Sequence, residues 1–226
     1  MLLLINKPPG LSSYDVIRVF KRKTQFKGKV GHAGTLDPFA NGLLILLLDS
    51  STKLFKQFQT FSKTYIAGCR LGYKTATLDI EGKITKGIEK QLNKDEIIKQ
   101  LNNFIGQITQ TVPIFSAKRY KGKRLYKYGQ EGKTISITNQ INVFNIKLLN
   151  YLHPLIFFQF QVSSGTYIRQ LCVDILQSLD NDCFVYYLTR TQIGPFSLKS
   201  ALSLEDLNSD NWRSNLLDPS AFSFPE

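Results

Sequence analysis

The segment GKVGHAGTLDPFANG, residues 28–42, is the most constrained stretch of the 226-residue sequence. Glycine, proline and small residues surround one carboxylate, Asp37, and one of the chain's two histidines, His32. Because a proline follows Asp37, this residue is pushed out of the helical region into an extended conformation. Gly34 and Gly42 allow tight backbone paths on both sides. The pattern predicts a carboxylate held at a fixed angle, and the alternative is an Asp-Pro turn whose side chain bonds its own backbone.

The charge balance favours an anionic partner. The chain has 29 basic and 17 acidic residues and a net charge of +12. A polyphosphate backbone explains such an excess, because each phosphate that is neutralised releases condensed counterions. The alternative is a soluble surface that is simply rich in lysine. A hydrophobic content of 42% with sixteen phenylalanines indicates a packed core and excludes wholesale disorder.

Cysteine and histidine usage argues against a metal or disulfide framework. Cys69, Cys172 and Cys183 are odd in number and lack framework spacing, which favours a reducing compartment. With two histidines and no CxxC pair, a zinc site lacks ligands. The opening MLLLINKPPG is too short for a signal sequence or a membrane span, and residues 43–48 are only strand-sized. We therefore expect a cytoplasmic protein without metal.

Strands and helices mix along the chain without βαβ regularity. Strands are expected at 2–5, 43–48, 63–71, 141–152 and 155–163. Helices are expected from Ser12 or Ser13 onward, at 52–60, at 94–104 and at 167–180. The last of these has the clearest apolar stripe. The mixture predicts an α+β domain with a mixed, largely antiparallel sheet flanked by helices.

Three side chains outside Asp37 are candidates for a site. Arg169 falls in the first turn of a helix that Thr166 can cap, where the helix dipole disfavours a cation. Such a cation requires a phosphate or carboxylate, unless it is a solvated surface arginine. Tyr65 is either a core aromatic or, beside nucleic acid, a stacking platform. His32 lacks neighbours that would bury it, so we expect a polar contact; no nucleophile-elbow sequence supports a Ser-His-Asp triad.

Five segments, taken in order, resemble the TruB family of RNA pseudouridine synthases. They are INKPPGLSSYDVIRVFKR, GHAGTLDPFANGLLIL, KTYIAGCRLGYKTATLDIEGKI, VPIFSAKRYKGKRLYKYGQEG and SGTYIRQLCVDI. The Gly-His-x-Gly-x-Leu-Asp-Pro loop is the most specific of them. The resemblance implies a catalytic domain over residues 1–202 and a tail over 203–226, without the PUA-like domain into which bacterial-type members continue.

The resemblance also implies roles for individual residues. Asp37 matches the catalytic aspartate, His32 the histidine that packs against flipped-out RNA, and Tyr65 the tyrosine that stacks on the target base. Since uracil is detached at N1 and rejoined through C5 without a cofactor, the carboxylate adds to the sugar, adds to the base, or takes a proton to form a glycal. The residues leave these three routes open.

The remaining matches surround that aspartate. Tyr167 and Arg169 belong to the Gly-Thr-Tyr-Ile-Arg motif, in which the arginine is the ion-pair partner of Asp37. Leu188 lines the uracil pocket, and Lys7 supports the catalytic loop. The family's Leu-Arg-Arg-Thr run is here Leu-Thr-Arg-Thr, with one cation fewer, which predicts weaker phosphate contacts.

The implied function is that of a monomeric tRNA pseudouridine-55 synthase that binds the T-arm and isomerises a T-loop uridine, with no membrane, metal or cofactor. The basic and tyrosine-rich stretch 117–129 is an RNA clamp in this interpretation, or else a solvated hairpin. The alternatives are a synthase acting on another RNA, including a guide-RNA-dependent subunit of the dyskerin type, and a non-catalytic tRNA-binding or RNA-folding module.

Overall fold

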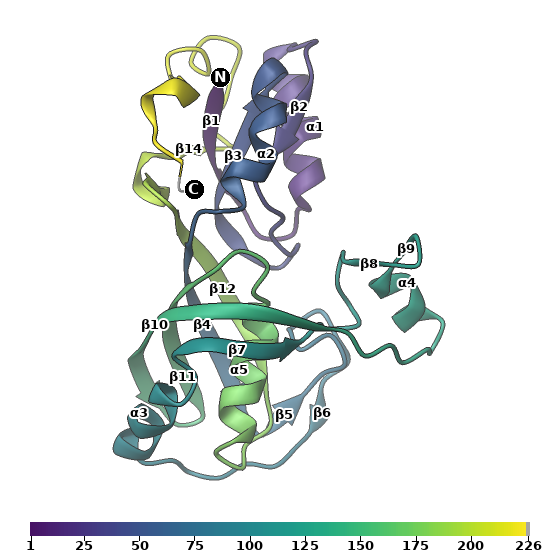
Figure 1. Ribbon diagram of the computed structural model, residues 1–226, viewed down its shortest axis with the longest axis vertical. Coiled ribbons are helices and arrows are strands. Elements are labelled where there is room, and N and C mark those ends of the chain that lie inside the picture. The colour runs from purple at the N-terminus through teal and green to yellow at the C-terminus, as the bar shows by residue number, and fades with distance from the viewer. Residues whose placement is uncertain (225–226) are drawn as a thin grey trace. The chain divides into compact units, whose positions relative to one another are not determined.

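The computed structural model describes residues 1–224 and divides the chain into two compact units (Figure 1). Unit 1 comprises Met1–Tyr65 and Leu188–Glu226, and unit 2 comprises Ile66–Tyr187. Two long strands, β4 (Lys63–Leu71) and β12 (Cys183–Ile193), contain the residues at which the chain passes from one unit to the other. The mixed sheet with flanking helices confirms the predicted α+β class.

Unit 1 is built on a short mixed sheet with the strand order β14-β1-β3-β12. Strand β3 pairs antiparallel with β1 and β2 and parallel with β12, whereas β14 pairs parallel with β1. The strands are β1 (Leu2–Lys7), β2 (Val30–His32), β3 (Asn41–Leu48), β13 (Phe196–Ser197), β14 (Leu202–Ser203) and β15 (Leu216–Leu217). The helices are α1 (Ser13–Thr24) and α2 (Phe55–Phe58), with 3₁₀ turns η1 (Asp49–Leu54), η2 (Leu198–Ser200) and η3 (Pro219–Ala221).

Both faces of the β1–β3 pair are buried, which explains the continuous apolar runs in these strands. Leu3 and Ile5 face a cluster that includes Phe20 of α1, whereas Leu2 and Leu4 face a second cluster around α2. The first cluster also contains Leu204, Leu207 and Trp212. Residues beyond 202 therefore contribute large apolar side chains to the core of unit 1.

Helix α1 begins as its sequence predicts. The amide of Asp15 donates to Oγ of Ser12 at 3.1 Å, and the amide of Ser12 donates to the Asp15 carboxylate at 3.1 Å, which forms a capping box. The helix expected over 52–60 is wrong in part, because residues 49–54 form a 3₁₀ turn. The hydroxyl of Thr52 donates to the Asp49 carbonyl at 2.7 Å, a local bond that competes with regular helix.

Unit 2 has the strand order β4-β11-β10-β7, with β10 antiparallel to both β11 and β7. Its further strands are β5 (Tyr73–Lys74), β6 (Thr85–Lys86), β7 (Gly106–Thr111), β8 (Arg119–Tyr120), β9 (Lys123–Arg124), β10 (Thr138–Leu152) and β11 (Leu155–Val162). Its helices are α3 (Lys94–Asn102), α4 (Leu125–Gln130) and α5 (Ile168–Gln177). The hairpin of β10 and β11 confirms the two adjacent strands expected around His153.

The three cysteines meet in the core of unit 2. Cys69 on β4 shares hydrogen bonds with Cys172 on α5 and with Cys183 on β12, and all three are buried and free. Burial raises the pKa of the Cys172 thiol, so these groups act as small core side chains rather than nucleophiles. Their contact fixes α5 against the sheet.

Helix α5 starts one residue later than Thr166 would place it. Tyr167 occupies the N-cap position without a side-chain cap, and the hydroxyl of Thr166 instead donates to the Ser163 carbonyl at 2.9 Å. The expectation that Thr166 caps this helix is therefore wrong.

Within residues 1–224, no helix has the length and apolar character needed to span a membrane.

Candidate active site

Asp37 lies half-buried on the loop that joins β2 to β3 in unit 1. The φ angle is positive at Gly34 in this loop, at 134°, and at Gly42, the second residue of β3, at 110°, as the glycines predict. A Cβ atom at Gly42 would lie 2.4 Å from the carbonyl oxygen of Arg190 on the neighbouring strand. The backbone path around the carboxylate therefore depends on glycine at this position.

A buried arginine holds the loop on the N-terminal side of Asp37. The side chain of Arg190 is in a residue only 1% exposed, and its Nε donates to the Leu43 carbonyl at 2.8 Å. Its Nη2 and Nη1 atoms donate to the carbonyls of Gly34 at 3.0 Å and Thr35 at 3.3 Å. The guanidinium therefore bonds three main-chain oxygens, two of which belong to the loop that carries Asp37.

Lys7 holds the loop on the C-terminal side of Asp37. This residue is fully buried, and its ammonium donates to the Pro38 carbonyl at 3.1 Å. The same ammonium donates to the Leu11 carbonyl at 2.6 Å. The amide of Gly10 adds a second bond to the Pro38 oxygen at 2.8 Å. A cation at the end of β1 thus ties the Lys-Pro-Pro-Gly turn to the Asp-Pro step.

Ser13 is the third residue whose side chain forms hydrogen bonds with the backbone of the loop. The amide of Leu36 donates to Oγ of the buried Ser13 at 2.9 Å, and this hydroxyl lies 3.2 Å from the Leu36 carbonyl, to which it donates. Both backbone groups of the residue before Asp37 are therefore satisfied by one side chain of α1. Contacts from β12, α1 and β1 fix the main chain around Asp37, and hence the direction in which its side chain leaves.

The surroundings of this loop are electropositive. Lys63, the first residue of β4, is 4% exposed, and its ammonium donates to the Phe61 carbonyl at 2.8 Å. Burial, and then the charge of Arg190, lower the pKa of Lys63 to about 8. The same two causes, in the same order, lower the pKa of His32. The imidazole of His32 is therefore held neutral over a wider pH range than usual.

His32, Tyr65 and Leu188 all belong to unit 1. His32 is half-buried at the end of β2, and the polar contact expected for this residue stays a prediction. Tyr65 on β4 is 8% exposed and Leu188 on β12 is 5% exposed. The contacts of these three residues with RNA stay predictions.

Tyr167 and Arg169 lie at the start of α5 in unit 2. The side-chain amide of Gln110 exchanges two hydrogen bonds with the backbone of Tyr167, at 2.9 Å and 3.0 Å, and this exchange anchors the helix to β7. Arg169 is buried and forms an ion pair with Asp79 at 3.0 Å. Its Nη2 atom also donates to the Phe115 carbonyl at 3.1 Å. The anion expected for this first-turn cation thus includes a carboxylate from unit 2.

Asp79 is itself held on several sides. Its Oδ1 atom accepts from the hydroxyl of Thr77 at 2.6 Å and from the amide of Glu81 at 3.0 Å. Because Asp79 is 3% exposed, these bonds and the guanidinium of Arg169 compensate for the lost hydration. Sequence reasoning missed Asp79, which lies 90 residues before its partner. The pairing of Arg169 with Asp37 stays a prediction from the resemblance.

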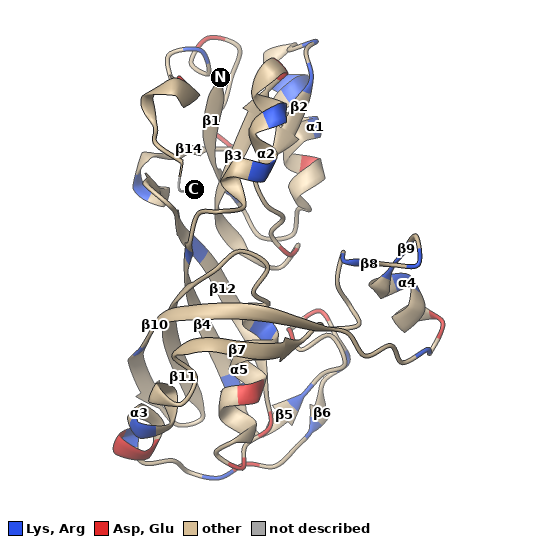
Figure 2. Cartoon of the chain, viewed as in Figure 1, with Lys and Arg blue, Asp and Glu red and all other residues tan. Residues whose placement is uncertain are grey.

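The basic stretch 117–129 forms a small hairpin, β8–β9, followed by α4. Figure 2 shows Lys and Arg residues along this segment. Two of its lysines lie over tyrosine rings: Lys121 over Tyr120 at 5.5 Å and Lys123 over Tyr128 at 4.8 Å. Lys123 also pairs with Glu131. The hairpin predicted from the sequence is present, and its role as an RNA clamp stays a prediction.

Comparison with protein families gives one assignment for most of the chain. Residues 21–168 match the model described as the TruB family pseudouridylate synthase, N terminal domain. A protein of Caldicellulosiruptor saccharolyticus named tRNA pseudouridine synthase B is 41% identical over 211 residues, which cover 93% of this chain and 73% of that protein. The protein of the same name from Aquifex aeolicus is 39% identical, with 92% and 74% of the two chains covered.

Solved structures give the same fold. A structure titled as a Cbf5-Nop10-Gar1 complex matches with a TM-score of 0.71 at 27% identity and covers 91% of this chain and 53% of that chain. An H/ACA ribonucleoprotein bound to a substrate RNA containing 2'-deoxyuridine matches with a TM-score of 0.68 at 25% identity, over 91% of this chain and 51% of that chain.

Proposed function

Since the chain belongs to the TruB family of pseudouridylate synthases, we propose that it is a tRNA pseudouridine synthase, an isomerase that converts the T-loop uridine at position 55 into pseudouridine. The observation that carries the proposal is the set of hydrogen bonds by which Arg190, Ser13 and Lys7 fix the main chain of the Asp37 loop. A carboxylate that must react with one atom of a nucleotide needs a fixed main chain, because a small displacement of the reacting group strongly lowers the rate.

The reaction breaks the bond from N1 of uracil to C1′ of ribose and forms a bond from C5 to the same carbon. The C5 proton is released and N1 gains a proton, so atoms balance without a cofactor. An ionised Asp37 serves each of the three routes left open by the sequence: attack on the sugar, addition to the base, or proton abstraction toward a glycal. We propose Asp37 as the catalytic residue for whichever step begins the rearrangement.

The target base must leave the RNA stack before Asp37 can reach its sugar. Flipping costs a few kcal/mol, on the order of 2–4. Stacking on Tyr65 would offset roughly 1–3 kcal/mol of that cost. We propose that Leu188 lines the uracil pocket, that His32 packs against the displaced RNA, and that Tyr167 and Arg169 complete the site, with Arg169 turned toward the Asp37 carboxylate as well as toward Asp79.

The partner that we propose is the T-arm of tRNA. A net charge of +12 suits a phosphate backbone, and the relatives at about 40% identity are named for tRNA. We further propose that the protein acts in the cytoplasm, as a monomer and without a bound metal. No group of three or more His, Cys, Asp or Glu side chains in the described part of the chain could hold a metal ion.

The test is to incubate the purified protein with an unmodified tRNA transcript and to map pseudouridine chemically. We expect one modified site, in the T-loop, and none in a transcript whose T-loop uridine is replaced by cytidine. Modification of an RNA without a T-arm, at equal rate, would instead favour the alternative of another RNA substrate. Tight tRNA binding without any pseudouridine would favour the binding module.

A further inference from the structure

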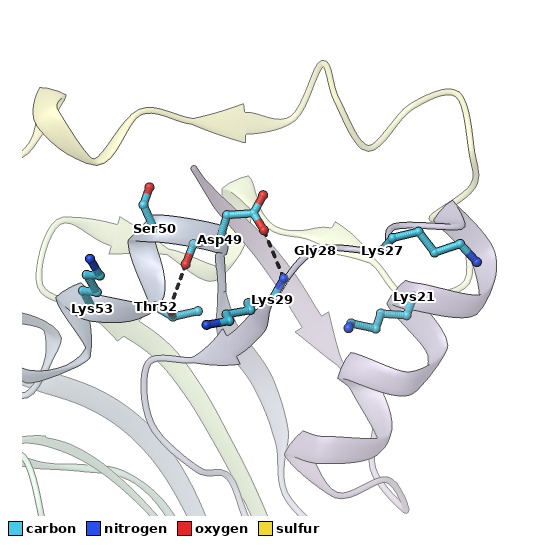
Figure 3. Close-up of a pocket in the computed structure, with 8 residues that line it drawn as sticks. All are labelled: Lys21, Lys27, Gly28, Lys29, Asp49, Ser50, Thr52 and Lys53. Carbon is cyan, nitrogen blue, oxygen red and sulfur yellow. Dashed lines mark hydrogen bonds between the residues drawn. The ribbon is translucent and has the colours of Figure 1, made fainter.

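A basic hollow of unit 1 lies outside the residues assigned to the reaction. A hollow of about 570 Å³ is bordered by four lysines, Lys21, Lys27, Lys29 and Lys53 (Figure 3). They come from α1, from the segment between α1 and β2, and from the 3₁₀ turn η1. One aspartate also lines the hollow, so the lining has a net charge of +3.

The four ammonium groups of this lysine hollow have no acidic partner. Within residues 1–224, none of the four lysines forms an ion pair with a carboxylate. The aspartate, Asp49, is already engaged with the backbone, since its Oδ1 accepts from the amide of Lys29 at 3.0 Å. Like charges left unpaired around one hollow repel one another, and a bound anion relieves that repulsion.

The arrangement of the lysines indicates the kind of anion. In Figure 3 the ammonium groups of Lys53, Lys29, Lys21 and Lys27 follow one another in this order across the view and do not converge on one point. Groups that converge on one point suit a single phosphate, whereas groups that are spread out suit a chain of phosphates. A lysine acts on phosphate as a point charge, which fits contact with a backbone without reading its sequence.

One lysine of the hollow lies next to the short strand that ends in His32, a residue of the candidate site. Lys29 directly precedes β2, and His32 ends it, so the two residues are three positions apart. At about 3.3 Å per residue, this corresponds to about 10 Å along the strand. Successive phosphates of a nucleic-acid strand lie only a few ångströms apart along the helix axis, so this distance corresponds to a few nucleotides.

We propose that the lysine hollow binds the sugar-phosphate backbone of the substrate RNA a few nucleotides from the target uridine. This inference rests on the proposed function, because it takes RNA as the substrate. The hollow contributes affinity that depends on salt, and it does not contribute to the chemical step. Lys29 and His32 would then contact neighbouring parts of one RNA strand from the two ends of β2.

The test replaces Lys27, Lys29 and Lys53 together by glutamine, and compares a control that replaces three exposed lysines of unit 2, Lys94, Lys99 and Lys147. Both variants lose the same charge. The dissociation constant for unmodified tRNA is measured from about 50 to 200 mM KCl, where phosphate contacts dominate the salt dependence. Single-turnover rates at saturating tRNA are measured in parallel.

We expect the hollow variant to lose about 2–3 from the slope of log affinity against log salt, since each phosphate contact contributes about 0.7–0.9. Its rate at saturating tRNA should stay close to that of the unchanged protein, and the control should keep the original slope. Equal slopes for the two variants would overturn the inference. If the unchanged protein binds tRNA but forms no pseudouridine, the proposed function fails, and the slopes still decide whether the hollow binds RNA.

Discussion

The guanidinium of Arg190 donates to the carbonyl of Gly34 at 3.0 Å, and this bond joins a fully buried cation to the loop that presents Asp37. An arginine inside a domain is usually costly unless every donor is satisfied. Here Leu43, Gly34 and Thr35 supply three main-chain acceptors. The burial of Arg190 is thus a structural requirement of the loop.

Replacing Arg190 by methionine should therefore damage both stability and turnover. The three carbonyls would lose their donors inside the fold, at roughly 1–3 kcal/mol for each group left unsatisfied. We expect a loss of stability of several kcal/mol in urea unfolding. The conservative Arg190→Lys keeps the charge but not the fork of donors, and should retain more stability while turnover still falls.

The Arg190→Lys variant is the informative one, because it separates positioning from folding. We expect its kcat to fall by about tenfold or more, with little change in KM, as for a group that holds the catalytic loop rather than the substrate. If Arg190→Lys instead raised KM and left kcat unchanged, Arg190 would act in RNA binding.

Ser13 and Ser12 allow a matched comparison at the start of α1. Ser13→Ala removes the hydroxyl that bonds both backbone groups of Leu36. Ser12→Ala removes the cap of the same helix and leaves that loop contact in place. Both should lower stability by about 1 kcal/mol. Only Ser13→Ala should also lower kcat in a steady-state assay; an equal loss from Ser12→Ala would show that the helix, not the loop contact, matters.

Gly42 and Gly106 separate steric clash from backbone strain. Both have positive φ, at 110° and 102° respectively. A Cβ at Gly42 would meet the Arg190 carbonyl oxygen at 2.4 Å, whereas a Cβ at Gly106 would have nothing within 4 Å. Gly106→Ala should cost about 1–2 kcal/mol from strain alone, and Gly42→Ala clearly more. Thermal unfolding of the two variants measures the difference, and equal losses would contradict the close approach of β3 and β12.

Lys63 makes stability depend on pH above neutrality. Its pKa is lowered from 10.5 to about 8, so between these values the unfolded chain holds a proton that the folded chain has released. The unfolding free energy therefore rises with pH in this window, and the stability gained above pH 10.5 is lost as the pH falls to about 8. The unfolding free energy of the protein, minus that of Lys63→Met, should therefore rise by roughly 3 kcal/mol across this window. If this difference in unfolding free energy did not change with pH, burial would not lower the pKa of Lys63.

Local sequence was sufficient for the elements whose signals are local. Ser12 and Asp15 predicted the start of α1, and the glycines around Asp37 predicted a constrained loop. The apolar stripe of α5 predicted its buried face. The turn after Asp49 was mistaken for α-helix, because the competition from its hydroxyl side chains is resolved only by the geometry of the chain.

The residues that hold the Asp37 loop and Arg169 in place could not be predicted in the same way, because they lie far from their partners in the sequence. Arg190 donates to carbonyls more than 140 positions earlier in the chain, and no local pattern indicates these partners. The first-turn position of Arg169 required an anion, but nothing local identified Asp79 as one. Ser13 carried no signal beyond capping. Long-range partners of a buried polar group become visible only when the fold places them.

The proposed reaction requires that the carboxylate of Asp37 starts the rearrangement. The most direct measurement is tritium release from tRNA labelled at C5 of uracil, with the unchanged protein and with Asp37→Asn, which keeps the size of the side chain and removes its charge. We expect stoichiometric release from the T-loop uridine by the unchanged protein. We expect none above background from a folded Asp37→Asn protein that still binds tRNA. Release at an undiminished rate from that variant would show that another group starts the rearrangement.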